Sequence, residues 1–327
     1  MLLAGITFSG CDRYKYDEGW FPETPLNLEL VNSEYDDYNS ALPPDFEGII
    51  PLLFSSNRNS LGGNYDIVEE FIFYQFDRHN GKLSISQFNS GYPDLMYYFE
   101  PLIIVPGIIN TAGNEFGPYI AEFYPEYYDK WNGQYLVMYA SNAGGNLDIK
   151  FINNFNTDSM NIFEGPFDIS FLNSSADDAY PCLTDDFNQV YFCSDRDGNF
   201  DLYYADIEGN DIIKSLSDTS YVPVKEVWGL NSEANDKCPY IKGKTMVFAS
   251  DFSTGYGGFD LYWSTMGENG LWSLPTNFGG KINTEYDEYR PVIIKDHYFK
   301  NDLMIFSSNR PGGKGGFDLY YVGVTKR

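Results

Sequence analysis

Two sets of acidic residues recur at fixed places in this chain and are its clearest candidates for chemistry. Each member of the first set follows a turn rich in Ser, Asn, Asp and Gly, and the set is Asp66, Asp148, Asp201, Asp260 and Asp318. Each member of the second set follows shortly after an Asn-Ser or Asn-Thr pair, and the set is Asp37, Glu115, Asp178, Asp236 and Glu288. Two carboxyl groups can hydrolyse a glycosidic bond, and a ring of carboxylates can hold a cation or a basic side chain.

The first set belongs to a repeated hairpin motif. Its clearest copy is at residues 306–318, where an apolar strand, a Gly-rich turn, Phe317 and Asp318 follow one another before a second apolar strand. This order of elements is typical of a β-hairpin. Weaker copies lie upstream, at residues 54–66, 139–148, 192–201 and 248–260.

The second set belongs to a pattern that precedes every hairpin. It reads Asn, Ser or Thr, two free positions, Asp or Asn, the acidic residue, two more free positions and usually Pro. The copies begin at Asn32, Asn110, Asn173, Asn231 and Asn283. The last position holds Ser40 in the first copy and Pro118, Pro181, Pro239 and Pro291 in the others. Repetition of one all-β unit along a chain predicts the blades of a propeller.

We therefore predict an all-β fold, a five-bladed β-propeller of four-stranded antiparallel blades, with six blades as the alternative. Residues 25–31 alternate apolar and polar side chains but lack a hairpin partner, and the last blade contains only three strands of its own. The N-terminal strand should supply the fourth strand of that blade, closing the ring and removing an exposed edge. Residues 25–327 are predicted to form one propeller domain.

In a propeller the two acidic sets are expected to play different roles. Five copies of the first set, related by rotation about the axis, cannot converge on one substrate. We expect these carboxylates to accept backbone N–H bonds from their own turns, with Arg58, Arg196 or Arg310 as nearby ion partners. The second set comes just before each innermost strand, where five carboxylates could form a ligand ring at the mouth of the channel. The structural alternative is that they hydrogen-bond the connections between blades.

Aromatic residues mark the places where blades one and two depart from the repeat. An insertion at residues 89–113 and a loop at residues 124–131 have no counterpart in the later blades. In a repeat protein, function is expected where one repeat differs from the others. The candidate recognition patch, for sugar rings or a protein partner, is Tyr97, Tyr98, Tyr124, Tyr127, Tyr128 and Trp131. The alternative is that these side chains cover the outer face of the two blades.

No cofactor or metal site is expected from the spacing of the other residues. Residues 195–201 carry oxygen side chains at alternate positions and faintly resemble a calcium loop, but they lack the Gly and the later Glu of an EF-hand. Calcium is the one ion that this pattern leaves open. His79 and His297 are far apart and predict neither a zinc site nor a catalytic triad.

The repeated hairpin resembles the TolB-like, PD40-type (WD40-like) β-propeller repeats. The resemblance is carried by copies such as Ser-Ser-Asn-Arg-Pro-Gly-Gly-Lys-Gly-Gly-Phe-Asp-Leu-Tyr at residues 307–320 and covers roughly residues 26–324. TolB itself resembles a six-bladed propeller, whereas this chain has five copies. Members of this family occur in the bacterial cell envelope, often as lipoproteins. The resemblance therefore implies an outer-membrane lipoprotein, either periplasmic or surface-exposed.

The N-terminus fits that implication. Residues 1–11 are apolar or small and end in Phe-Ser-Gly-Cys, which resembles a lipobox, so that Cys11 would be the lipidated residue after a signal remnant. Residues 12–24 are polar without strand alternation, as expected of a tether. We predict attachment to a membrane only through this lipid anchor.

Net charge excludes some partners. The chain of 327 residues has 21 basic and 47 acidic residues and a formal net charge of −26. Nucleic acid and anionic membrane surfaces should be repelled. An envelope protein or a glycan remains as the partner, and we expect a monomer. Cys182 and Cys193 fall on neighbouring strands, but Cys182 should lie opposite Tyr191, so buried free thiols are favoured over a disulfide.

Two functions follow from these observations. The leading hypothesis is a non-catalytic binding or scaffolding propeller lipoprotein of the bacterial cell envelope that recognises a protein or glycan partner. The alternative is a glycoside hydrolase-like five-bladed propeller that uses carboxylates at the channel mouth.

Overall fold

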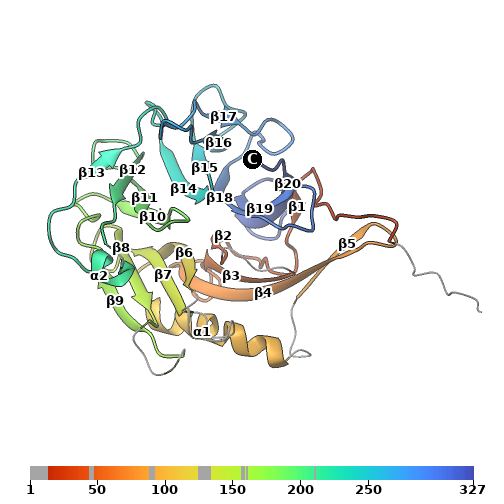
Figure 1. The fold of residues 1–327 in the computed structure, drawn as a ribbon, viewed down its shortest axis with the longest axis horizontal. Helices are drawn as coiled ribbons and strands as arrows, with labels where there is room; N and C mark the ends of the chain where they lie inside the picture. The colour runs from red at the N-terminus through yellow and green to blue at the C-terminus, as the bar shows by residue number, and fades with distance from the viewer. Residues whose placement is uncertain are drawn as a thin grey trace, which may run out of the picture.

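The strands of the molecule form a five-bladed β-propeller (Figure 1). The computed structural model describes residues 14–43, 48–87, 93–123, 134–155, 159, 161–209 and 211–327, and within the helix at residues 93–109 it describes side chains from residue 101 onward. In this part of the chain the strands form five four-stranded antiparallel sheets. The five-bladed prediction is thereby confirmed, and the six-bladed alternative is not.

Each blade runs from an innermost to an outermost strand. Blade one consists of β2 (Asp37–Ala41), β3 (Ile49–Ser56), β4 (Asp66–Asp77) and β5 (Lys82–Gln87). Blade two consists of β6 (Glu115–Phe123), β7 (Gln134–Ser141), β8 (Asp148–Asn153) and β9 (Glu164–Asp168). Blade three consists of β10 (Asp178–Leu183), β11 (Gln189–Ser194), β12 (Asp201–Asp206) and β13 (Val224–Glu226), with α2 (Ile212–Leu216) before β13. Blade four consists of β14 (Asp236–Lys242), β15 (Thr245–Ser250), β16 (Asp260–Thr265) and β17 (Thr276–Asn277).

Blade five joins the two ends of the chain. It consists of β18 (Glu288–Ile294), β19 (Asp302–Ser308), β20 (Asp318–Val324) and β1 (Leu26–Asn27). Leu26 lies opposite Tyr321 and Asn27 opposite Tyr320 in the antiparallel ladder. The predicted closure by the N-terminal strand is therefore confirmed, although the paired strand is shorter than the alternating segment at residues 25–31.

The Asn that opens each repeat joins its blade to the preceding one. The Asn32 side chain accepts a hydrogen bond from Leu319 N at 2.9 Å and donates one to Leu319 O at 2.9 Å. The same pair of bonds joins Asn110 to Ile67, Asn173 to Ile149, Asn231 to Leu202 and Asn283 to Leu261. In each case the partner is the residue after a first-set aspartate. We call this contact the asparagine clip.

A β-bulge interrupts every innermost strand two residues after its acidic residue. The ladder shifts register there in all five blades, and the bulge residues have positive φ: they are Asn39, Gly117, Tyr180, Cys238 and Arg290. In four blades the next residue is a proline, which a bulge tolerates because it needs no N–H there. The repeated Pro position thus marks a bend in the strand that lines the centre.

Side chains of the bulges fill the centre of the propeller. Arg290 from blade five is 0% exposed and donates to Pro118 O of blade two at 2.9 Å. Asn39 Nδ2 from blade one lies 3.4 Å from the Tyr180 hydroxyl of blade three. At Gly117 an added Cβ would lie 2.2 Å from the Tyr180 ring, so glycine leaves the space that this ring occupies. Contacts between blades that are not neighbours close the channel at this level.

The insertion after blade one contains a helix, α1 (Pro93–Ile109), which the sequence does not predict. In Figure 1 it runs below β4 and blade two. Its Leu102, Val105 and Ile109 are 0% exposed and pack in a cluster with residues of blades one and two, such as Leu53 and Tyr139. This spacing places the three side chains on one face of the helix. The described part of the insertion therefore packs between two blades.

In the described residues, no helix is both long and apolar enough to span a bilayer.

The segment before β1 packs on blade five. Phe21 is 0% exposed and stacks on Phe299 with ring centres 4.1 Å apart, and its N–H donates to Asn301 Oδ1 at 2.9 Å. Gly19 forms a β-bridge with Phe299. This differs from the free tether expected over residues 12–24, because the buried Phe21 ring anchors the segment. Cys11 and the rest of residues 1–13 lie outside the described residues.

Cys182 lies opposite Tyr191, and Cys182, Cys193 and Cys238 are free and buried, as the spacing of the first two predicts.

Substitution of Asn32 tests the clip at the point where the ring closes. Asn32→Ala leaves the buried Leu319 N without a partner and removes one of the two hydrogen bonds to Leu319 O, which keeps the bond from Leu28 N. We expect the free energy of unfolding to fall by about 1–3 kcal/mol. Denaturant unfolding measures the loss, with Asn173→Ala, which breaks the same clip between blades two and three, as the control. Only the Asn32 variant should also speed amide exchange in β1. A stability unchanged in both variants would contradict a structural role for the clip.

Candidate functional site

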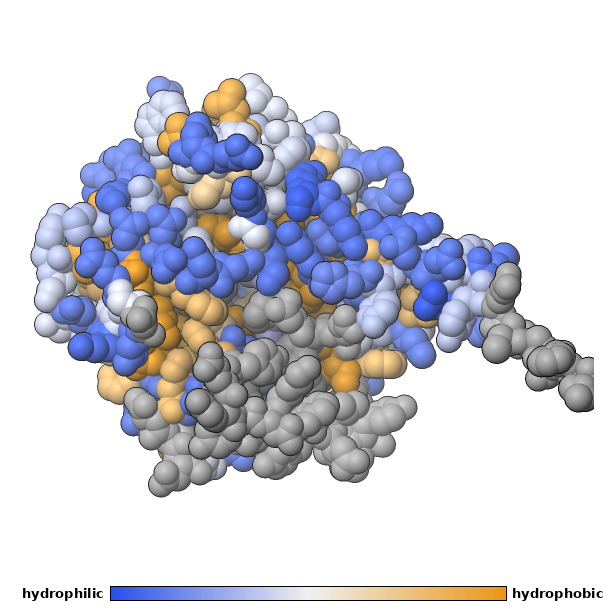
Figure 2. Space-filling model, viewed as in Figure 1, coloured by the Kyte–Doolittle hydropathy of each residue, from blue (hydrophilic) through white to orange (hydrophobic). Residues whose placement is uncertain are grey.

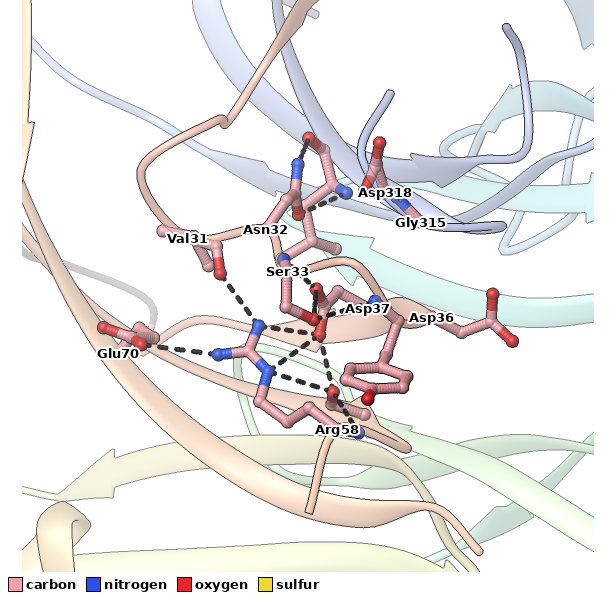
Figure 3. Close-up of polar contacts among 12 residues, drawn as sticks. Val31, Asn32, Ser33, Asp36, Asp37, Arg58, Glu70, Gly315 and Asp318 are labelled. Atoms are coloured by element: carbon pink, nitrogen blue, oxygen red, sulfur yellow. Dashed lines mark hydrogen bonds and ion pairs between the residues drawn. The ribbon is translucent and has the colours of Figure 1, made fainter. Parts of the chain in front are cut away.

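The second acidic set is buried in a repeated polar cluster, drawn for blade one in Figure 3. Asp37 is 0% exposed. Its Oδ2 accepts hydrogen bonds from Ser33 N at 2.5 Å and from Ser33 Oγ at 2.8 Å, and its Oδ1 accepts one from Ser56 Oγ at 2.6 Å. Arg58 completes the cluster, with its NH2 2.7 Å from Asp37 Oδ1 and 2.8 Å from Val31 O.

Blades three and five repeat this cluster with their own arginines. Arg196 NH2 lies 2.6 Å from Asp178 Oδ1, and Arg310 NH2 lies 2.9 Å from Glu288 Oε1. The prediction that these arginines pair with the first acidic set is wrong. The arginine follows β3, β11 or β19, and from there its side chain reaches the start of the adjacent innermost strand. The partner is therefore the carboxylate across the hairpin.

The geometry favours the structural alternative for the second set. All five carboxyl-bearing residues are 0–1% exposed. In blade two, Thr111 Oγ1 lies 2.7 Å and Ser141 Oγ 2.9 Å from Glu115 Oε1. In blade four, Ser232 N donates to Asp236 Oδ2 at 2.7 Å. A ligand at the channel mouth would have to displace bonds within a blade before it could reach these oxygens.

Burial shifts the pKa of two of these carboxyl groups. Loss of hydration raises the pKa of Glu288, and bonds from Thr284 and the charge of Arg310 oppose the shift. Loss of hydration also raises the pKa of Asp236, opposed by the nearby Ser250 hydroxyl and by hydrogen bonds from Ser232. Among the described residues the acid of blade four has no ion pair, whereas that of blade five pairs with Arg310.

The first acidic set bonds to its own turn, but by different donors. Lys314 N and Gly315 N donate to Asp318, and Tyr256 N donates to Asp260 at 2.6 Å, as the sequence predicts. In blades one to three the donors are instead side-chain amides: those of Asn59, Asn146 and Asn199, which bond to Asp66, Asp148 and Asp201. The shorter turns of blades two and three place an amide where blades four and five place backbone N–H groups.

Other candidate residues lie partly outside the described part of the chain. The aromatic candidates Tyr97, Tyr98, Tyr124, Tyr127, Tyr128 and Trp131 lie outside the residues whose side chains are described. In the resembled calcium loop, Asp195 Oδ1 accepts Asp177 N at 2.8 Å and Asp197 Oδ2 accepts the Tyr203 hydroxyl at 2.7 Å. Within the described ranges there is no group of three His, Cys, Asp or Glu side chains that could hold a metal ion.

Blade four contains a feature that the motif analysis missed. Phe252 takes the position of the arginine, and a cavity of about 520 Å³ opens beside the Asp236 cluster. The signal was present in the sequence as the one copy that reads Ser-Asp-Phe where blade three reads Ser-Asp-Arg. This difference indicates a cavity only because the arginine pairs with the second acidic set in the other blades.

Comparison with known proteins supports the fold. No protein-family profile and no curated protein matches the chain. The endo-arabinase from Bacteroides thetaiotaomicron superimposes with a TM-score of 0.52 at 9% identity, covering 93% of this chain and 98% of that one. The α-L-arabinofuranosidase from Podospora anserina, in complex with cellotriose, gives 0.51 at 11% identity, covering 94% and 97%. At such identities the likeness concerns the fold alone.

A putative TolB from Agrobacterium tumefaciens is also similar, with a TM-score of 0.43 at 13% identity, covering 89% of this chain and 79% of that chain. A score this low adds nothing to the sequence motif. The resemblance to TolB-like repeats therefore rests on the hairpin residues.

The pH dependence of stability tests the environment of the first set. Burial raises the pKa of Asp201 to about 6, and the nearby charges of Asp236 and Glu226 add to the shift. A raised pKa means that the folded protein holds the proton more tightly, so stability falls as pH rises from about 4 to 6. Asp201→Asn removes this loss. Because solvent screens the half-buried group, we expect the variant to gain about 1 kcal/mol over the wild type between pH 4 and pH 7.

Urea unfolding at the two pH values measures this gain. Asp186→Asn is the control of opposite sign, because hydrogen bonds from Thr184 and Asn188 lower the pKa of Asp186. A lowered pKa contributes stability that is fully present only above the unfolded pKa of about 4, so Asp186→Asn should be less stable than the wild type at both pH values, with little change between them. Equal shifts for both variants would contradict the assigned environments.

Proposed function

We propose that this protein is a non-catalytic binding or scaffolding propeller of the bacterial cell envelope that recognises a protein or glycan partner. One observation carries the proposal: the bulge residues fill the centre of the ring, and the carboxylates of the second acidic set already accept hydrogen bonds within their own blades. A propeller built in this way offers its outer surfaces and loops to a partner rather than an open axial cleft to a substrate.

The alternative is a glycoside hydrolase that uses carboxylates at the channel mouth. Such an enzyme needs two carboxyl groups about 5–10 Å apart, one of them with a raised pKa. The raised pKa of Glu288 favours this reading. The same carboxyl group is 0% exposed and accepts bonds from Thr284, Ser308 and Arg310, so a sugar has no path to it without breaking the cluster.

Envelope location and lipid attachment are part of the proposal. They are supported by the resemblance to TolB-like repeats and by the lipobox-like sequence that ends at Cys11. The net charge of −26 favours a basic or neutral partner over nucleic acid or an anionic lipid surface. A monomer held by a lipid anchor would present the loops of blades one and two to such a partner.

Cross-linking in native envelopes tests the binding function. The protein is purified through a C-terminal tag after cross-linking, and captured molecules are identified by mass spectrometry. Deletion of the whole insertion is unsuitable, because Leu102, Val105 and Ile109 of α1 are buried against two blades. A triple variant, Tyr97→Ser, Tyr127→Ser and Trp131→Ser, removes aromatic candidates instead. We expect a reproducible partner whose yield falls at least tenfold in this variant.

A matched control changes aromatic residues elsewhere. Tyr221→Ser and Tyr298→Ser alter side chains that are 89% and 61% exposed on blades three and five, and they should leave capture unchanged. Equal loss in both variants would mean that the patch is not the interface. Absence of any reproducible partner would count against a scaffold.

Sugar release tests the alternative. Purified protein is incubated with arabinan, xylan and peptidoglycan, and reducing sugar is measured for the wild type and for Glu288→Gln. We expect no release above the buffer control. Release that Glu288→Gln abolishes, while the unfolding midpoint is retained, would overturn the non-catalytic proposal.

A further inference from the structure

Three blades keep an arginine in one particular slot, and blade four does not. Arg310 shows what the slot requires. Its NH2 donates to Glu288 Oε1 at 2.9 Å and to Ile282 O at 2.7 Å, and its Nε donates to Ser308 Oγ at 3.0 Å. Its Cζ lies 5.2 Å from the centre of the Phe306 ring and 5.0 Å from that of Tyr320. The slot is thus an acid, a carbonyl, a hydroxyl and two rings.

The same slot recurs around the other arginines. Arg196 NH2 bonds to Asp178 and Leu172 O, and its Cζ lies over Phe192 and Tyr203. Arg58 repeats the bonds to its acid and to a carbonyl, with its Cζ 5.2 Å from the Phe54 ring. Three independent copies therefore define one guanidinium-binding arrangement.

Blade four keeps every wall of this slot but lacks the arginine. The turns of blades four and five have equal length, so Phe252 takes the position of Arg310. The cavity of about 520 Å³ is lined by the residues equivalent to those around Arg310: Asp236, Leu230, Ser250, Phe248 and Tyr262. In the described chain, Asp236 has no ion pair. The cavity is therefore a vacated arginine slot rather than an unrelated hollow.

Polar groups in this cavity lack the partners that their equivalents have. Ser250 is 2% exposed, and its Oγ has no hydrogen-bond partner of good geometry among the described residues, although it lies near enough to the Asp236 carboxyl to lower the pKa of that group in part. In blade five the equivalent Ser308 Oγ accepts bonds from Arg310 N and Nε. A buried acid without a cation and a buried hydroxyl without a partner are both costly, and a guanidinium would satisfy both.

We propose that this cavity binds the guanidinium group of an arginine side chain presented by a partner protein. The inference deepens the binding function proposed above and rests on it for the existence of the partner. Asp236 supplies the charge, Leu230 O and Ser250 Oγ the further acceptors, and the Phe248 and Tyr262 rings the stacking faces.

Arginine suits the slot better than lysine does, because its planar fork can bond an acid and a carbonyl together while stacking on rings. The entrance is apolar, as expected for contact with a protein. Phe252 and Leu274, which line the cavity, are 41% and 79% exposed, and the neighbouring Trp228 is 79% exposed. Figure 2 shows apolar surface around β16 and β17 at the top of the view, amid a largely hydrophilic face. The net charge of −26 would also attract a basic partner.

Titration with short capped peptides tests the proposal on the intact protein. The probe is acetyl-Gly-Arg-Gly-amide, and the controls carry lysine or citrulline in place of arginine. Binding is followed by two-dimensional NMR, which also locates the shifted amides. We expect the arginine peptide to bind with at least tenfold lower Kd than either control and to shift residues of β14 to β16. Equal binding of the lysine or citrulline peptide would overturn the assignment, as would no binding at millimolar concentration.

Phe252→Arg is the decisive variant, because it supplies the arginine from within the blade. We expect it to raise Tm and to abolish binding of the arginine peptide. Arg310→Ala opens the equivalent slot in blade five and should add a second binding site for the same peptide. Undiminished binding to Phe252→Arg would show that the peptide binds elsewhere and would overturn the proposal. Asp236→Asn is a supporting variant, expected to lose binding if it folds.

The source of the guanidinium and the proposed function are tested separately. Free arginine carries an α-ammonium and an α-carboxylate that a residue within a protein lacks. If free arginine binds at least tenfold more tightly than the capped peptide, the occupant is a small molecule and the protein partner is wrong. Specific peptide binding without a cross-linked partner in envelopes would refute the scaffold while retaining the slot.

Discussion

The asparagine clip between neighbouring blades is the contact on which the rest of the structure depends. Each clip pairs one side-chain amide, buried or partly buried, with both the N–H and the C=O of a residue in the preceding blade. The acidic residue five positions later adds a backbone bond to the same blade, as Asp37 N does to Phe317 O. Because the clip bonds to main-chain groups and the second bond joins two main chains, the register between neighbouring blades does not depend on their surface side chains. The copy at Asn32 joins the two ends of the chain and closes the ring.

Once the clip has placed the start of each innermost strand, the buried acid beside it needs partners. Blades one, three and five provide an arginine from the next hairpin. Blade two has Ala143 at that position, and Glu115 accepts hydrogen bonds from the hydroxyls of Thr111 and Ser141. Blade four bonds Asp236 to Ser232 but has Phe252 in place of the arginine, and a cavity lies beside the acid. The blades thus differ in which groups neutralise or hydrogen-bond the same buried carboxylate.

The fold is shared with arabinan-degrading enzymes of very low sequence identity, and fold does not imply function. In this chain, positive-φ bulges turn Asn39, Tyr180 and Arg290 inward, and these side chains make contacts at the centre between blades that are not neighbours. Under the proposed function, recognition would fall to the periphery, where the blades differ from one another.

Local patterns in the sequence determined the hairpins, the number of blades, the closure by the N-terminal strand and the placement of Cys182 opposite Tyr191. The hairpins and the cysteine register follow from alternation and turn residues within one blade, and the number of blades follows from repetition. The closure follows from counting strands, because the last blade lacks one strand and the N-terminal segment has one to spare. Tertiary structure alone decided that Arg58, Arg196 and Arg310 pair with the second acidic set, that α1 wedges between two blades and that Phe21 is buried. It also decided that Phe252 leaves an arginine slot open. The arginine pairs and the open slot depend on how far a side chain reaches across a hairpin, which alternation and turn residues do not specify. The burial of Phe21 depends on a contact with Phe299 at the other end of the chain, and no local pattern contains such a contact.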